Sequence, residues 1–588
     1  MRGMTLVFSD EQHKALSHTG SCLLVGTAGT GKTTLLLEKT ARAVQKYGAN
    51  QVAVLGFAWR STQLMKAQFA EQFPQYAGQV FFGTIRDVAH QALEKNGTLV
   101  KFIPNHEVRA LIQKAMVQEK FEGTLEEAEH IIRTFRSRLK NPQESERHYP
   151  LFVKYRELID ATGGVDRHTM IRKHILAMDK GEAEPAPVQA MVVDNMQDAT
   201  PLQKRWLQTH LAHGVTLLMA GNDDLTAFGL DGAMGAEALR EVADLEGVSK
   251  FELTLNYRTP PELLPALSKL PRLLRERVAK TEKSAPEAAA FKGHLQVFGC
   301  DDRAGEINVI LQHIQTLNKR QGRVQVGLIV RDDQQANELA HLLNLRGIRT
   351  ANWARLVWEN PAAHVVLDIL YVLLNQAKES QLFNVLSAFG VGAEVLAQLA
   401  QAGVQATGWL AEEAPIPANL KGEIGAFMAV RRQLLGMWSL LRDRKTTPRE
   451  AFKALVFDVL THAKKEDKPL ILLALDMLLH VDGPLVEKLQ TLQQETLPDM
   501  ASPIVVAPVR EVRNMQFQQV ILPFANDAVW PPRAGKILGT DMEHERRLFY
   551  LAVSRTQGGL IVTHTGVPSL FVQDIQAALK TFKKPSVS

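Results

Sequence analysis

The sequence predicts an α/β protein with two α/β domains, each interrupted by a helical insertion. Short apolar runs alternate with amphipathic stretches near both ends of the chain, as where Ser21 to Val25 precedes Thr33 to Ala43. This alternation is typical of parallel sheets covered by helices on both faces. The chain has 588 residues. At roughly 150 residues per domain, this length corresponds to about four structural units.

The first α/β domain is predicted from five apolar runs with the length of buried strands, at residues 21–25, 51–57, 79–82, 191–193 and 216–220. Between the third and fourth runs the pattern changes to long, charged, amphipathic helices. That stretch ends in the Gly-, Glu- and Pro-rich residues 181–187, which have linker composition. We therefore expect a first domain at residues 1–89 and 188–290, with an insertion at residues 90–187.

The second α/β domain begins near His294. Its predicted strands are residues 295–298, 324–330, 504–506, 519–523 and 559–563, and a helix is predicted at residues 334–345. Another helical region separates the second strand from the third. We therefore expect a second domain at residues 291–361 and 498–588, with an insertion at residues 362–497.

Composition excludes few functions. The 68 Lys and Arg residues exceed the 63 Asp and Glu residues by a net charge of +5, which permits a nucleic-acid partner without requiring one. No apolar run is long enough to span a bilayer, and the N-terminus does not resemble a signal peptide, so a cytoplasmic location is expected. The only cysteines, Cys22 and Cys300, are expected to be free, buried thiols.

A glycine-rich loop is the strongest chemical signal in the sequence. Residues 26–33 have glycine at the first and sixth positions and end in Lys32 and Thr33, and they lie between a predicted strand and a predicted helix. This is the P-loop pattern, in which backbone N–H groups surround phosphate oxygens, the lysine reaches the terminal phosphates and the hydroxyl binds Mg²⁺.

A P-loop also requires an acidic residue for the metal at the end of a neighbouring strand. Asp194 directly follows the apolar residues 191–193 and meets this requirement. Read alone, an Asp at such a place is more often a helix cap or a turn residue. The P-loop upstream favours the assignment to Mg²⁺.

Further segments follow in a fixed order along the chain. They are Gln12 and residues 56–60, 83–86, 194–198, 221–233, 255–258 and 545–555. Together they resemble the motifs of the UvrD/Rep branch of superfamily 1 DNA helicases, from residue 8 to about residue 565. The resemblance implies two RecA-like P-loop domains, each interrupted by a helical insertion, that bind ATP between them and single-stranded DNA across both.

The resemblance also implies roles for individual residues. Nucleotide contacts would come from Gln12, Gly26, Gly29, Gly31, Lys32, Thr33, Thr34, Gln197 and Tyr257, and Mg²⁺ ligands from Thr33 and Asp194. The residues at catalytic positions are Lys32, Asp194, Asn195, Arg258 and Arg555. Nucleic-acid contacts would come from Phe57, Trp59, Arg60, Thr84, Arg86 and Phe228, although core packing is the alternative role for the three aromatic residues.

The sequence departs from the family pattern at the positions that serve hydrolysis. The catalytic Glu is Asn195, the Gln that senses the γ-phosphate is Leu225, and an Arg of the coupling motif is Asp231. The motif before the last is reduced to residues 510–517, where Arg513 and Asn514 replace a Lys-Gly pair. Phosphate and Mg²⁺ ligands are retained, and we expect residues 510–517 to couple the two domains poorly.

Three functions fit these observations. The chain is a working ATP-dependent DNA helicase or translocase, a weakly hydrolysing ATP-binding subunit of a larger DNA-processing or defence complex, or a regulator that switches when its domains close. We favour the second, with single-stranded DNA or RNA and a partner protein such as a nuclease. Residues 566–588 are predicted to form one amphipathic helix and a basic tail, without a nuclease signature.

Overall fold

The computed structural model describes residues 7–95, 97, 101–290, 292–320, 324–401, 424–465, 467–480, 502–532 and 541–582. The chain divides into two compact units. The first consists of residues 1–336, 346–354 and 499–588, and the second of residues 337–345 and 355–498. In the described part of the chain, no helix combines the length and the apolar character that a membrane span requires.

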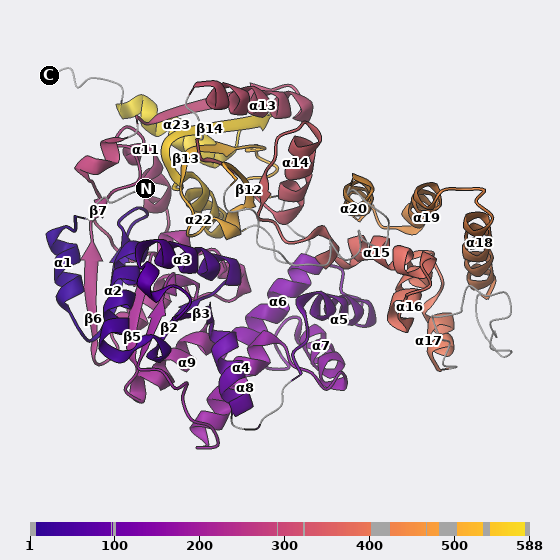
Figure 1. Ribbon diagram of the computed structural model, residues 1–588, viewed down its shortest axis with the longest axis horizontal. Helices are drawn as coiled ribbons and strands as arrows, with labels where there is room; N and C mark the ends of the chain where they lie inside the picture. The colour runs from indigo at the N-terminus through magenta and orange to yellow at the C-terminus, as the bar shows by residue number, and fades with distance from the viewer. Residues whose placement is uncertain are drawn as a thin grey trace. The chain divides into compact units, whose positions relative to one another are not determined.

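The N-terminal sheet of the first unit contains six parallel strands in the order β3-β2-β4-β5-β1-β6 (Figure 1). They are β1 (Ser21–Gly26), β2 (Val52–Gly56), β3 (Phe81–Thr84), β4 (Ala190–Val193), β5 (Thr216–Gly221) and β6 (Val248–Leu253). The five predicted strands are confirmed. The sequence analysis missed β6, because this strand lies at the sheet edge and includes exposed polar residues such as Lys250 and Glu252.

Helices cover both faces of this sheet. Leu23 and Val25 of β1 pack toward α9 (Pro201–Ala212) and α10 (Ala236–Ala243). The alternate residues of β1 pack on the other face toward α2 (Lys32–Tyr47) and α3 (Trp59–Gln72). Full burial of one such aliphatic side chain contributes roughly 1.5–3 kcal/mol, so the period-two pattern fixes the strand between two helical layers. We call this sheet and its helices the first lobe.

Between β3 and β4 the chain forms five helices. They are α4 (Ile85–Lys95), α5 (Asn105–Gln118), α6 (Leu125–Ser137), α7 (Tyr149–Ala161) and α8 (Arg167–Asp179). Helices α5, α6 and α7 enclose a core of their own that includes Ile131, Phe135, Phe152 and Tyr155. Helix α8 packs on α4 and α9, which joins this helical region to the first lobe.

The C-terminal sheet also has six parallel strands, in the order β11-β12-β10-β13-β14-β9. They are β9 (His294–Cys300), β10 (Val326–Val330), β11 (Ala351–Asn352), β12 (Ile504–Pro508), β13 (Phe517–Leu522) and β14 (Thr556–Thr565). The five predicted strands are again confirmed, and only the two-residue β11 was missed. With α13 (Arg303–Arg320), α22 (Met542–Val553) and α23 (Leu570–Phe582), this sheet forms what we call the second lobe. These two parallel sheets with their helices confirm the predicted α/β class.

The second unit is helical. It contains α15 (Pro361–Leu373), α16 (Glu379–Ala388), α17 (Ala393–Gln401), α18 (Ile424–Arg442), α19 (Pro448–His462) and α20 (Lys468–His480), together with most of α14 (Asp333–Leu345). Its core is formed by aliphatic and aromatic side chains such as Leu370, Phe427 and Phe452. Residues 402–423 and 481–501 lie outside the described residues. The domain boundaries set from the sequence stay a prediction.

One cysteine differs from expectation. Cys22 is fully buried in β1, as predicted, but Cys300 is only partly buried. Cys300 lies at the end of β9, the edge strand of its sheet, where no neighbouring strand covers that side. Its position on an edge strand therefore explains why the prediction of full burial was wrong.

Candidate nucleotide-binding site

The glycine-rich loop connects β1 to α2 in the first lobe. Gly29 and Gly31 have φ angles of 80° and 79°, the left-handed region that favours glycine. A Cβ atom on Gly29 would lie 2.3 Å from Oδ1 of Asn256, and one on Gly31 would lie 2.8 Å from Nε2 of Gln12. Both the backbone conformation and the space around the loop therefore require glycine at these positions.

Lys32 begins helix α2 and folds back over the loop. Its Nζ donates hydrogen bonds to the carbonyl oxygens of Gly26 (2.9 Å) and Thr27 (2.6 Å) and to Oγ1 of Thr30 (3.2 Å). Burial lowers the pKa of Lys32 to about 7, the nearby Asp194 raises it, and repulsion from Arg258, among other cations, lowers it. The Lys32 ammonium group is therefore buried near other cations, and a bound anion would stabilise its charged form.

Thr33 and Asp194 meet beside this lysine. Oγ1 of Thr33 donates to Oδ2 of Asp194 at 2.8 Å, and the backbone N–H of Asn195 donates to Oδ1 at 2.9 Å. Asp194 directly follows β4 and is buried, and burial raises its pKa while these two hydrogen bonds lower it. A hydroxyl and a carboxylate in contact are oxygen ligands of the kind that Mg²⁺ prefers. Thr34 follows in the first turn of α2.

Gln12 and Tyr257 contact the loop from outside it. Gln12 belongs to α1 (Asp10–Ser17), and its Nε2 donates to the carbonyl oxygen of Thr30 at 3.3 Å. A capping box with Ser9 fixes the start of that helix. The backbone N–H of Tyr257 donates to the carbonyl oxygen of Gly29 at 2.9 Å. Both predicted nucleotide-binding residues are therefore attached to the P-loop.

Arg258 of the first lobe and Arg555 of the second lobe place positive charge near Lys32 of the P-loop. Nη1 of Arg258, in the first lobe, donates to the carbonyl oxygen of Ser554 at 3.5 Å. Burial lowers the pKa of Arg258 to about 10, and burial together with repulsion from Arg258 lowers the pKa of Arg555 well below its usual range. Arg555 donates to the carbonyl oxygens of Leu551 and Arg513, so its guanidinium is held within the second lobe. Among the described residues, Nε of Arg258 has no hydrogen-bond partner.

Known proteins share this arrangement of motifs in sequence. Residues 8–240 match the model of the UvrD/REP helicase N-terminal domain. Over these residues the chain is similar to UvrD-like superfamily 1 helicases. The chain is 22% identical over 291 residues to DNA helicase II of Escherichia coli and 22% identical over 301 residues to the putative ATP-dependent DNA helicase YjcD of Bacillus subtilis.

A third relative is the probable DNA helicase II homolog of Rickettsia conorii, which is 24% identical over 299 residues. These alignments cover 45% to 47% of this chain and 40% to 46% of the relatives. The chain therefore aligns with less than half the length of the relatives it matches. The family relationship supports a UvrD-like superfamily 1 helicase and implies ATP use and nucleic-acid binding by the family.

Several residues that differ from the UvrD/Rep pattern contact the other lobe. Asn195, at the position of the catalytic Glu, has a φ of 61° and donates from Nδ2 to Oδ1 of Asn514 at 3.2 Å. Its Oδ1 accepts from Nε2 of Gln197 at 3.3 Å. Nδ2 of Asn514 in turn donates to the carbonyl oxygen of Ser61 at 3.5 Å. Both ends of the Asn195 amide are thus occupied by protein groups.

A buried ion pair lies beside this contact. Nη1 of Arg513, in the second lobe, lies 3.0 Å from Oδ2 of Asp198, in the first lobe, and the two residues are 5% and 2% exposed. The other carboxylate oxygen of Asp198 accepts from the backbone N–H of Ala227 at 2.9 Å. The Arg513 guanidinium also lies 4.3 Å from the ring centroid of Phe228. Phe228, a predicted base-stacking residue, is therefore covered by an arginine on one face.

Asp231 forms a third contact. Its carboxylate lies 2.6 Å from Nδ1 of His130, 3.4 Å from Nη1 of Arg133 and 3.9 Å from Nη1 of Arg510. These cations lower the pKa of Asp231 well below its usual range, although burial opposes them as the largest single effect. Sequence reasoning missed His130 and Arg133, because α6 has no recognisable motif and the pairing partners lie about 100 residues away.

Three residues of the segment 510–517 contact the first lobe. They are Arg510, Arg513 and Asn514. In the pair Asn195–Asn514 both residues differ from the family pattern, whereas Asp198, the partner of Arg513, matches it. The expectation that this segment couples the lobes poorly stays a prediction. We call the pairs Asn195–Asn514, Asp198–Arg513 and Asp231–Arg510 the inter-lobe latch.

The residues predicted to contact nucleic acid differ in how exposed their side chains are and in which protein groups they already contact. Trp59 begins α3 and is 40% exposed, whereas Phe57 packs against the first-lobe core. Nη1 of Arg60 donates to the carbonyl oxygen of Trp353. Arg86 pairs with Asp87 at 2.6 Å, and Thr84 donates to the same carboxylate at 2.8 Å. Of the three predicted aromatic residues, Trp59 is the most accessible to a nucleic-acid base.

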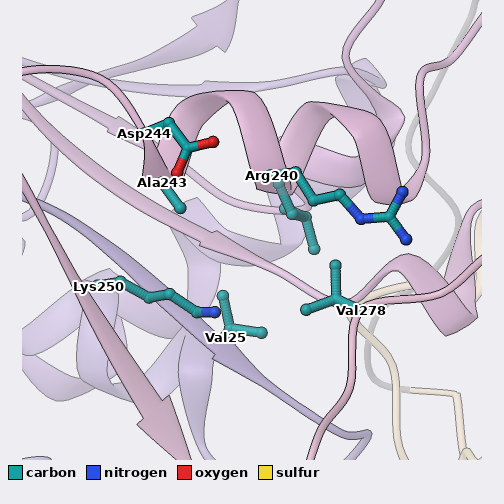
Figure 2. A pocket seen from close by; sticks show the side chains of 7 residues that line it. Val25, Arg240, Ala243, Asp244, Lys250 and Val278 are labelled. Atoms are coloured by element: carbon teal, nitrogen blue, oxygen red, sulfur yellow. The ribbon is translucent and has the colours of Figure 1, made fainter.

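A separate small pocket lies between α10 and the β1–β6 edge of the first sheet (Figure 2). Its volume is about 220 Å³, and Val25, Leu239, Arg240, Ala243, Asp244, Lys250 and Val278 line it. None of the predicted site residues belongs to this lining. The pocket is therefore distinct from the P-loop, and nothing in the family motifs assigns it a ligand.

Proposed function

We propose that this protein binds MgATP and single-stranded nucleic acid and hydrolyses ATP slowly, as a subunit of a larger DNA-processing or defence complex. The observation that supports slow hydrolysis best is the Asn195 amide. It occupies the position of the catalytic base and donates to Asn514 of the second lobe. An amide does not accept a proton at neutral pH, and here its hydrogen-bonding groups contact other side chains.

The proposal that ATP binds rests on the charges around the P-loop. Lys32, Arg258 and Arg555 repel one another in a buried setting, with Asp194 as the nearby acidic group. Such a cluster fits a bound polyanion, whose charge would relieve the repulsion. Lys32 and the loop would hold the phosphates, Thr33 and Asp194 would hold Mg²⁺, and Gln12 and Tyr257 would contact the base. Bound MgATP would supply the cleavable γ-phosphate.

Two further features favour weak hydrolysis. Leu225, at the position of the γ-phosphate sensor, is 7% exposed, and its side chain cannot form a hydrogen bond. Loss of a positioned general base typically costs about a hundredfold to ten-thousandfold in rate, or roughly 3–5 kcal/mol of barrier. Binding of phosphate and Mg²⁺ uses other residues, so affinity is retained while turnover is low.

The inter-lobe latch favours a binding role over a motor. A translocase of this fold would open and close its lobes in step with its nucleotide. In this chain three polar pairs connect the lobes, and no P-loop residue takes part in them. These pairs stabilise the closed arrangement of the lobes without nucleotide. ATP binding therefore changes the arrangement of the lobes less than it would in a motor. The partner in this proposal is a catalytic protein such as a nuclease.

The competing function is an active ATP-dependent DNA helicase of the UvrD/Rep type. It is favoured by the retention of Lys32, Asp194, Arg258 and Arg555 and by an acidic neighbour, Asp198, near the hydrolysis position. Asp198, however, is already paired with Arg513. A third possibility is a regulator that uses the lobes as a switch. Steady-state ATP turnover separates the helicase from the other two, and co-purification of a partner separates the subunit from the regulator.

The first test is nucleotide binding by Lys32→Ala. We expect the parent protein to bind MgATP in calorimetry and the variant to bind at least tenfold more weakly, because a charge-assisted contact to phosphate is lost. His462→Ala, an exposed change in the second unit, serves as the control. Equal affinity of parent and Lys32→Ala would contradict the P-loop assignment.

The second test is binding of single-stranded DNA and RNA at several salt concentrations. Affinity should fall steeply as salt rises, because basic residues that neutralise phosphates release counterions. Trp59→Ala should weaken binding by about 1–3 kcal/mol if its ring stacks on a base. Phe57→Ala is the comparison, since Phe57 packs on the core and should affect stability more than affinity. Unchanged affinity in a folded Trp59→Ala protein would remove this ring from the interface.

A further inference from the structure

The second unit contains a cluster of three side chains that no helicase motif includes. His341 lies on α14, and Asp476 and His480 lie on α20. Asp476 and His480 are four residues apart, a spacing that places both on one face of a helix. All three residues belong to the second unit, so the cluster connects two helices of one compact body.

The three groups converge on a small volume. Nε2 of His341 lies 2.6 Å from Oδ2 of Asp476, and Nδ1 of His480 lies 3.3 Å from Oδ1 of the same carboxylate. One ring nitrogen of each histidine and one carboxylate oxygen all lie within 4.8 Å of one another. The two imidazole ring centroids are 5.4 Å apart.

Access differs among the three side chains. The His341 side chain is 12% exposed, whereas those of Asp476 and His480 are 48% and 44% exposed. A metal ion can therefore enter from solvent, and water can complete its coordination. Nδ1 of His480 also lies 2.8 Å from the carbonyl oxygen of Asp476.

We propose that His341, Asp476 and His480 form a binding site for a divalent transition-metal ion of the zinc class. Two imidazole nitrogens and one carboxylate oxygen suit Zn²⁺ and its neighbours, whereas Mg²⁺ and Ca²⁺ prefer all-oxygen ligand sets. Three protein ligands leave a fourth, tetrahedral position for water or for an incoming ligand. The ion would cross-link α14 to α20, and it is independent of the Mg²⁺ proposed at the P-loop.

The alternative is a hydrogen-bonded His–Asp–His group without a metal. In that case the carboxylate accepts an N–H from each ring, and the contact is one of several surface ion pairs of small energetic effect. The two cases differ in their response to added metal and to pH. Metal binding requires unprotonated imidazoles, so affinity should fall as the pH decreases below the ordinary histidine pKa of about 6.5.

The test uses the full-length chain after dialysis against a chelator. Zn²⁺ is titrated in calorimetry, and Co²⁺ is titrated with visible absorbance as a readout of tetrahedral coordination. We expect one saturable equivalent, a Co²⁺ spectrum typical of a nitrogen- and oxygen-ligated tetrahedral site, and no displacement by millimolar Mg²⁺. The P-loop variant Lys32→Ala should bind the metal unchanged, which separates this site from the nucleotide site.

Substitution of each proposed ligand tests where the metal ion binds. His341→Ala, Asp476→Asn and His480→Gln should each reduce Zn²⁺ affinity at least tenfold, whereas His462→Ala, an exposed histidine of the same unit, should not. His480→Gln replaces a half-exposed side chain and preserves the fold, as circular dichroism would verify. Absence of saturable binding by the parent, equal affinity in the three variants, or displacement by Mg²⁺ would overturn the metal site.

Discussion

Arg513→Ala is expected to destabilise the first unit by about 3–5 kcal/mol, because it leaves the Asp198 carboxylate buried without its cation. The carboxylate still accepts a hydrogen bond from the backbone N–H of Ala227, but a neutral donor cannot neutralise the charge. The change also removes the guanidinium over the Phe228 ring. Urea unfolding of parent and variant, followed by tryptophan fluorescence, measures the difference.

The size of this effect should depend on pH. Burial already raises the pKa of Asp198, and loss of Arg513, which lowers it, should raise that pKa further. A carboxyl group with a raised folded-state pKa favours the folded state at low pH and loses that contribution as pH rises through the folded-state pKa. The destabilisation caused by Arg513→Ala should therefore be smaller at pH 5 than at pH 8.

Two variants serve as controls for this prediction. Lys154→Ala breaks an exposed pair with Glu157 and should change stability by less than about 1 kcal/mol. The double variant Arg513→Met with Asp198→Asn removes both charges and should recover much of the lost stability, since no uncompensated charge remains. A destabilisation by Arg513→Ala no larger than that of Lys154→Ala would show that the latch contributes little.

The second large effect concerns ATP turnover by Asn195→Glu. A restored carboxylate would raise turnover by a factor of about a hundred or more if the other catalytic groups were in place. We expect a smaller increase, because Leu225 cannot contact a γ-phosphate and the latch holds the lobes together. The double change Asn195→Glu with Leu225→Gln should exceed the sum of the single changes in log rate, since residues that act together are non-additive.

The assay is steady-state ATP hydrolysis with saturating single-stranded DNA. It compares the parent, the two single variants and the double variant, and Lys32→Ala serves as the inactive control. Brisk turnover by the unaltered protein, on the order of tens per second as in ordinary enzymes, would contradict weak hydrolysis if Lys32→Ala abolished it. That result would favour the active helicase instead.

Much of the fold follows from local sequence patterns. Buried parallel strands are continuous apolar runs, so ten of the strands could be predicted from residues such as 191–193 and 519–523. In the two six-stranded sheets, the missed strands are β6, an edge strand with polar residues, and β11, a strand of two residues. The edge strands β3 and β9 were predicted, so β6 was missed because of its exposed polar residues and not because of its edge position alone.

The sequence by itself determined the P-loop pattern and the identity of the residues at its predicted ligand positions. Lys32, Thr33 and Asp194 belong to motifs whose spacing is set by one strand, one loop and one helix, so their roles can be read locally. The differences from the family pattern at Asn195 and Asp231 could also be recognised at single positions of the sequence. The sequence does not show which residues these side chains contact in the folded chain.

Only the tertiary structure decided which residues the altered positions contact. Asn195 meets Asn514, and Asp198 meets Arg513, across more than 300 residues of sequence. Local patterns report which groups are charged, polar or apolar, but they do not report which distant group lies within hydrogen-bond distance. Long-range pairing depends on how two sheets and their helices pack. Asn195, Asp231 and Arg513, which looked like losses in the sequence, therefore contact the other lobe in the folded chain.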